Sequence, residues 1–160
     1  MKTLIIGWGN PIAGDDGLGW RAAEIVASCI AEAEDVDIVV SSHGGLRIAE
    51  RMLGYDRVIV LDATVAGCEP ALTRDVLRPR EMDAIDEPIG HDGSLVGAIR
   101  ALRRLQADAL PEEIVTLGAA IAAPRDWDTR LSPSAEPAAI ELAEAALAEL
   151  ERKREGIAVG

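Results

Sequence analysis

The stretch LIIGWGNPIAGDDGLG, residues 4–19, decides the fold class. It opens with the short apolar run 4–6 and continues through a loop rich in glycine and aspartate. It then passes into an amphipathic segment at 17–31 that is rich in Ala, Glu, Ile and Val. This order predicts a strand, a turn and a helix.

The rest of the chain repeats the alternation of strand and helix patterns. Strands are predicted at 36–40, 58–61, 74–77 and 114–117, and helices at 46–53, 95–105 and 135–153. The 58–61 run is almost wholly apolar, which is typical of a central strand covered on both faces. We therefore predict an α/β fold with three layers: one mostly parallel, twisted sheet with helices on both faces. No repeat or long linker divides the chain, so residues 1–160 are predicted to form a single domain.

Composition and charge exclude several classes of protein. The 160 residues are 49% hydrophobic and 28% charged, which is the composition of a globular chain that can bury a core. Aromatic residues make up only 2%, so the core must consist of Ala, Val, Ile and Leu. The formal net charge of −12 repels phosphate backbones, which argues against general binding of nucleic acid.

Features of targeting and redox chemistry favour a cytoplasmic protein. The apolar run near the amino terminus is too short for a signal peptide, and no run approaches the roughly 20 apolar residues of a membrane span. Cys29 and Cys68 have neither CxxC spacing nor the pattern of a disulfide framework. We therefore expect a protein of the reducing cytoplasm, without a membrane partner.

Acidic residues follow two of the predicted strands. Ligands of open α/β sheets bind beyond the carboxyl ends of the strands, so Asp15, Asp16 and Asp62 are in informative positions. Capping of a helix explains one aspartate of the pair, whereas Asp62 ends an apolar run and needs a partner if it is buried. His91 lies in a loop before a predicted helix. Two carboxylates and an imidazole that converge would form a three-ligand metal site with open positions.

Other chemistries fit these residues less well. A dinucleotide site is disfavoured because Ile12 replaces the third glycine of GxGxxG, and because carboxylates lie where the pyrophosphate would bind. The absence of HExxH and GxSxG excludes a zincin and an α/β-hydrolase nucleophile elbow. Two nucleophilic sets remain that no spacing supports: Ser94 with His91 and Asp62, and Cys68 with His43.

The motif GxGNPxxGDDGxG at residues 7–19 resembles the opening motif of the hydrogenase maturation peptidases. The VIVLDA segment at 58–63, the loop with His91, and the LSP stretch at 131–133 before a final helix resemble the same family. The resemblance thus covers nearly the whole chain. It implies an endopeptidase that removes the carboxyl-terminal extension of a [NiFe]-hydrogenase large-subunit precursor after nickel has been inserted.

The resemblance also implies roles for individual residues. It assigns Asp16, Asp62 and His91 to contact with nickel and to nickel-assisted hydrolysis, although many members have glutamate where this chain has Asp16. The nickel is expected to be carried by the thiolates of the substrate, not held permanently by the enzyme. Many members carry DGGTxG after the second strand, whereas this chain has VSSHGG at 40–45. The SHGGL form at 42–46 and the LSPSAE stretch at 131–136 resemble members that mature soluble, bidirectional hydrogenases.

Several roles stay open at this point. Asp15 is a candidate proton acceptor or a helix cap, and Asn10 is a turn former or a donor to an oxyanion. His43 either helps to dock the substrate or is an ordinary loop residue. Two alternative functions remain: a non-catalytic chaperone that binds the nickel-loaded precursor, and another small metal-dependent hydrolase.

Overall fold

The computed structural model describes residues 1–30, 35–65, 72–82, 94–122 and 127–157. In chain order, its strands and α-helices are β1 (Thr3–Trp8), α1 (Leu18–Cys29), β2 (Val36–Ser41), α2 (Leu46–Glu50), β3 (Arg57–Val65), β4 (Leu72–Leu77), α3 (Leu95–Gln106), β5 (Glu113–Ile121) and α4 (Ala135–Ile157). Three short 3-10 helices accompany them: η1 (Gly14–Gly17), η2 (Pro79–Glu81) and η3 (Ala107–Ala109).

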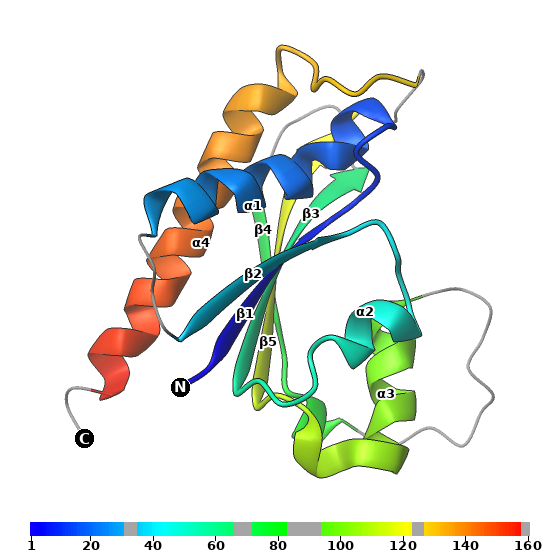
Figure 1. The fold of residues 1–160 in the computed structure, drawn as a ribbon, viewed down its shortest axis with the longest axis vertical. Helices are drawn as coiled ribbons and strands as arrows, with labels where there is room; N and C mark the ends of the chain where they lie inside the picture. Colours follow the sequence, from blue (N-terminus) through cyan, green and yellow to red (C-terminus); the bar gives the residue numbers. More distant parts are fainter. Residues whose placement is uncertain (31–34, 66–71, 83–93, 123–126, 158–160) are drawn as a thin grey trace.

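The strands form one sheet in the order β2-β1-β3-β5-β4. All neighbours pair in parallel except β4, which runs antiparallel to β5 at the edge. Helices α1 and α4 pack on one face of the sheet, and α2 and α3 pack on the other (Figure 1). The predicted three-layer α/β fold with a mostly parallel sheet is therefore confirmed.

Most element boundaries differ from the predicted ones by a few residues. The main difference concerns β3, which runs to Val65 and not only to residue 61, because its pairing with β5 continues through Asp62. Asp62 therefore lies within the strand and not after it. The first helix also begins as the 3-10 turn η1, and α1 proper starts at Leu18. No helix in the part of the chain that the structure describes is long and apolar enough to cross a membrane.

Alternating side chains of the central strands fill two separate cores. Ile59 and Leu61 point toward α1 and α4, whereas Val58 and Val60 point toward α2 and α3. All four side chains are at most 1% exposed, so β3 is buried on both faces as the apolar run predicts.

Glycines allow α1 to lie almost directly on the backbone of the sheet. A Cβ atom at Gly19 would overlap the carbonyl oxygens of both Trp8 and Leu61. A Cβ atom at Gly7, on β1, would lie 2.5 Å from the carbonyl oxygen of Gly19 and 2.7 Å from the Cβ of Ala23. Gly7, which belongs to the nucleotide-like pattern, and Gly19 thus serve close packing between a helix and two strands.

Helix α4 is fixed to the sheet by a buried group of charges. Arg57, at the start of β3, donates through Nε to Glu113 at 3.0 Å and through Nη1 to the carbonyl oxygen of Glu149 at 2.7 Å. Arg74 donates to the Glu149 carboxylate at 2.9 and 3.0 Å, which lowers the pKa of Glu149. Because Arg57 and Glu149 are each 2% exposed, the loss of either partner would leave a buried charge that is only partly compensated by the remaining ion pairs.

The packing at Gly19 leads to a test by substitution. Alanine at position 19 gains about 1 kcal/mol of helix propensity, yet its Cβ must displace two backbone carbonyls. We expect Gly19→Ala to lower the free energy of unfolding by more than about 3 kcal/mol in urea titrations. Gly54→Ala is the control: no atom lies within 4 Å of the new Cβ, and its positive φ costs only about 1–2 kcal/mol. Equal stability of the two variants would contradict the packing account.

Candidate active site

The structure brings Asp16 and Asp62 to the same edge of the sheet. Asp16 lies in η1, directly after β1, and Asp62 lies near the carboxyl end of the neighbouring strand β3. The backbone N–H of Asn10 donates to Oδ2 of Asp16 at 2.7 Å and fixes that carboxylate. The negative charge of Asp16 is near enough to raise the pKa of Asp62, so the two carboxylates share one local environment.

Asp62 is the strongly perturbed acid of this region. Burial raises its pKa to about 6, a backbone hydrogen bond from Ala63 opposes the rise, and the charge of Asp16 adds to it. A carboxyl group with a pKa near 6 can accept and return a proton at neutral pH, as a general acid or base must. Strong perturbation beside a second carboxylate is a physical mark of functional sites.

Glycines also shape the loop that carries Asp16. Gly9 has a φ of 141°, and a Cβ atom there would overlap the carbonyl oxygen of Asp16. A Cβ atom at Gly17 would lie 3.1 Å from the Cα of Pro11. Asn10 completes the turn, since its Oδ1 accepts from the N–H of Ile12 at 3.2 Å. Asn10 is thus a turn former, one of the two roles left open for it by the sequence.

Asp15 serves as a tether and not as the helix cap that its position suggests. Its Oδ1 accepts from the backbone N–H of Ser132 at 2.7 Å, and its Oδ2 accepts from the Ser132 hydroxyl at 2.8 Å. Next to it, the N–H of Gly14 donates to the carbonyl oxygen of Asp128 at 2.7 Å. The capping interpretation is wrong because the segment before α4 reaches η1 and occupies both oxygens of Asp15.

Of the other predicted site residues, the structure describes Ser94 and His43 but not His91 and Cys68. His91 and Cys68 lie outside the described residues, so the predicted role of His91 as third ligand stays a prediction. Ser94 caps α3, since its Oγ accepts from the N–H of Gly97 at 3.1 Å. His43 is exposed after β2. In the described ranges, no group of three or more His, Cys, Asp or Glu side chains is arranged to hold a metal ion.

A cavity of about 580 Å³ opens beside Asp62 on the face of the sheet that carries α3. Thr64, Thr73, Asp75 and Thr116 contribute polar groups to its wall. These residues were not predicted as site residues from the sequence. Their signals are the polar run Thr73–Asp75 in β4 and the single hydroxyl of Thr116 in the mostly apolar β5, and both become informative only when the register of the two strands is known.

Comparisons with known proteins agree with the fold and the motifs. No protein-family model matches the chain. The hydrogenase expression/formation protein HupD of Bradyrhizobium diazoefficiens is 30% identical over 137 residues, which span 82% of this chain and 69% of that protein. The hydrogenase 2 maturation protease of Escherichia coli is 27% identical over 105 residues, 64% of each chain. The chain belongs to the hydrogenase maturation protease family.

A solved structure supports the same family fold. The hydrogenase maturating endopeptidase HybD from Escherichia coli superposes with a TM-score of 0.72, covering 96% of this chain and 94% of that one, at 21% identity. At that identity the likeness establishes the fold. In this member of the hydrogenase maturation protease family, Asp16 and Asp62 bring two carboxylates together at the carboxyl edge of the sheet.

The raised pKa of Asp62 leads to a test of stability. The folded-state pKa lies above the unfolded one, so the stability that this group contributes is complete below about pH 4 and is lost as the pH rises through about 6. At about pH 7.5, in the presence of a chelator, we expect Asp62→Asn to be more stable than the wild type by on the order of 1–2 kcal/mol. At about pH 4 the two should be nearly equal. A less stable variant at the higher pH would contradict the assigned environment.

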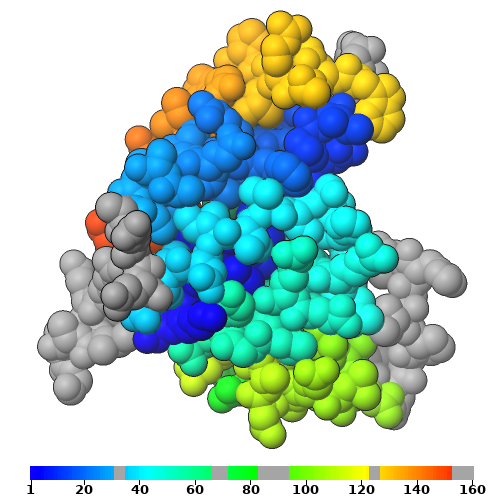
Figure 2. Space-filling view, viewed as in Figure 1, coloured from blue at the N-terminus to red at the C-terminus, as the bar shows by residue number. Residues whose placement is uncertain are grey.

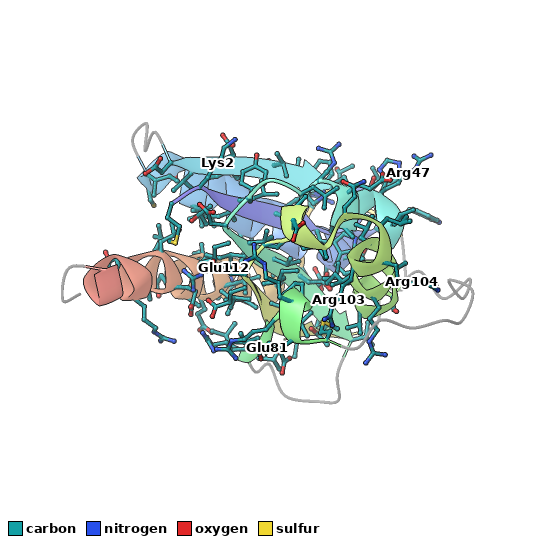
Figure 3. All side chains as sticks on the ribbon, turned by 90° about the horizontal axis from the view of Figure 1, so that it is seen from below. Lys2, Arg47, Glu81, Arg103, Arg104 and Glu112 are labelled. Atoms are coloured by element: carbon teal, nitrogen blue, oxygen red, sulfur yellow. The ribbon has the colours of Figure 1, made fainter. Side chains whose placement is uncertain are left out.

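The tether between Asp15 and Ser132 is tested by a double-mutant cycle. Asp15→Ala and Ser132→Ala should each lower the free energy of unfolding by about 1–3 kcal/mol, and the double variant should lose clearly less than the sum. Glu112→Gln is the control, because Glu112 (labelled in Figure 3) directly precedes β5 at the opposite, amino edge of the sheet. It forms an exposed ion pair with Arg80 there. This substitution should change stability by less than about 0.5 kcal/mol. Strict additivity of the two single changes would mean that the bond between the Ser132 hydroxyl and Asp15 carries no energy.

Proposed function

We propose that this chain is an endopeptidase that removes the carboxyl-terminal extension of a [NiFe]-hydrogenase large-subunit precursor once nickel is in place. Nickel carried by the precursor assists the hydrolysis. The observation that carries the proposal is the pair of carboxylates, Asp16 and Asp62, at the carboxyl edge of the sheet in a member of this family. Asp16, Asp62 and His91 are the proposed catalytic and nickel-contacting residues.

The carboxylate pair has the chemistry that a divalent cation would stabilise. Burial and the charge of Asp16 both disfavour the ionised form of Asp62, and no described lysine or arginine forms an ion pair with it. A cation placed between the two carboxylates would offset both effects. Oxygen and imidazole donors are suitable ligands for nickel, and the thiolates of the precursor would supply the rest.

In this mechanism the individual carboxylate oxygens of Asp16 and Asp62 have different roles. Oδ2 of Asp16 accepts from Asn10, which leaves Oδ1 for the nickel of the precursor. Asp62 offers one oxygen to nickel and the other to a water molecule, whose proton it takes as the oxygen attacks the scissile carbonyl. The carbon–nitrogen bond then breaks, and the proton passes to the leaving amine. Nickel acts as a Lewis acid on the carbonyl or on the attacking water.

Exposed apolar side chains around this edge support a protein substrate. Ile12 follows β1, Val65 ends β3, Leu72 begins β4 and Trp127 precedes α4; all four are exposed. The surface is also hollowed between the loop after β1 and the β2–α2 segment (Figure 2). Apolar side chains gathered around a polar centre are typical of an interaction surface for a macromolecule.

The test compares two forms of one precursor. Purified large-subunit precursor, with or without inserted nickel, is treated with metal-stripped enzyme, and products are followed by gel shift and mass spectrometry. We expect cleavage of the nickel-loaded form alone. Asp16→Asn, Asp62→Asn and His91→Ala should each slow it by at least about 100-fold, while Glu112→Gln should not.

The same experiment separates the alternative functions. Equal cleavage of both forms would refute the dependence on substrate nickel and favour an ordinary hydrolase. A stable complex with the nickel-loaded precursor, without any cleavage, would favour a non-catalytic chaperone.

A further inference from the structure

The cavity beside Asp62 lies over a row of paired residues in the sheet. In the register of the strands, Asp62 on β3 lies opposite Gly118 on β5, and Gly118 lies opposite Thr73 on β4. Neighbouring strands are about 4.8 Å apart, so this row extends about 10 Å from Asp62 to Thr73. We call the space above the row the Gly118 cavity; its volume is about 580 Å³.

The Gly118 cavity exists because α3 does not reach this far along the sheet. Farther toward the amino edge, Val58, Val60 and Ile114 are covered by buried side chains of α3, such as Ile99. Helix α3 starts only at Leu95, which lines the cavity. The same face of the sheet thus changes from a packed core to an open recess at the row of Asp62.

The floor of the recess depends on the absence of a side chain at Gly118. A Cβ atom there would lie 2.6 Å from the hydroxyl oxygens of both Thr64 and Thr73. The two hydroxyls therefore converge over the glycine, and any side chain at this position would displace them and make the recess shallower. Gly118 is a determinant of the shape of the cavity.

The wall combines apolar surface with negative charge. Trp8, Leu77 and Val96 are among its apolar members, whereas Asp62 and Asp75 supply carboxylates. Among the described residues that line it, none is a lysine, an arginine or a histidine. An apolar side chain would find contacts here, whereas an acidic one would lose water and face the carboxylate of Asp75 without a cationic side chain among the described lining residues.

We propose that the Gly118 cavity is the substrate subsite for the side chain next to the scissile bond, and that it accepts an apolar side chain and rejects an acidic one. The inference rests on the proposed function, because a scissile carbonyl must lie at Asp62. Consecutive Cα atoms are about 3.8 Å apart, so the residue adjacent to a bond held at Asp62 lies at the mouth of the recess. Its side chain then points toward Gly118, and Asp75 faces its end.

The first test measures selectivity. The cleavage site of the precursor is mapped by mass spectrometry, and each flanking residue is replaced in turn by Leu, Ala, Lys or Glu. At one of the two positions we expect wild-type enzyme to show a kcat/KM for Leu at least about 30-fold above that for Glu. Similar values for all four residues at both positions, or a preference for Lys over Leu, would overturn the inference.

Changes in the enzyme should alter these ratios in specific directions. Asp75→Asn should lower the preference for Leu over Glu by about tenfold, because the carboxylate that faces the end of the substrate side chain is removed. Gly118→Ala should lower the preference for Leu over Ala by about tenfold, because the floor is raised. Glu112→Gln should alter neither ratio. The inference would also be overturned if Asp75→Asn and Gly118→Ala both kept the wild-type preferences for Leu over Glu and for Leu over Ala.

A binding measurement separates this inference from the proposed function. The Asp62→Asn variant is isotope-labelled for NMR and titrated with a peptide that spans the mapped cleavage site of the precursor. If no cleavage is seen, the peptide spans the carboxyl-terminal region of the precursor. We expect the amide signals of Thr73, Thr116 and Gly118 to shift with the Leu peptide and to shift far less with the Glu peptide. Such shifts without cleavage by wild type would support the subsite and contradict the peptidase function. Cleavage by wild type without shifts at these amides would contradict the subsite alone.

Discussion

At Gly19, the backbone of α1 approaches the carbonyl oxygens of Trp8 and Leu61 so closely that no side chain fits between them. This contact joins the first helix to the last residue of β1 and to β3 at the residue before Asp62. The chain must therefore turn sharply between Trp8 and Leu18, and the glycines of the loop permit that turn. Asp16 lies in the turn and is thereby held beside Asp62. The placement of the two acids follows from how closely a helix can pack on a sheet.

Holding two carboxylates together in a half-buried place is unfavourable for the free protein, and the raised pKa of Asp62 reflects that cost. Contacts with α4 compensate on either side of the site. Asp15 binds Ser132 just before α4 begins, and Arg57 and Arg74 bind Glu149 in the second half of that helix. The acidic pair thus rests on a framework whose longest helix is fixed just before its start and again along its length.

Local patterns were sufficient to predict the layers of the fold, because apolar runs and glycine-rich turns act over a few residues. They also indicated Asp16 and Asp62, since acids at strand ends meet at one edge of a parallel sheet. They failed where distant segments decide the outcome. Ser132, which binds Asp15, is 117 residues away in sequence, and the pairing of β3 with β5 makes Asp62 part of a strand. Thr73 and Asp75 reach the site only because β4 runs antiparallel, which no local pattern specifies.

The central claim is that Asp16 and Asp62 act together on the nickel that the precursor carries. X-ray absorption at the nickel edge tests it most directly, on nickel-loaded precursor mixed with enzyme and frozen before turnover. The account predicts that wild-type enzyme adds oxygen or nitrogen neighbours to the sulfur neighbours of the nickel, and that the double variant Asp16→Asn, Asp62→Asn does not. An unchanged nickel spectrum in a complex that gel filtration shows to be formed would contradict the account.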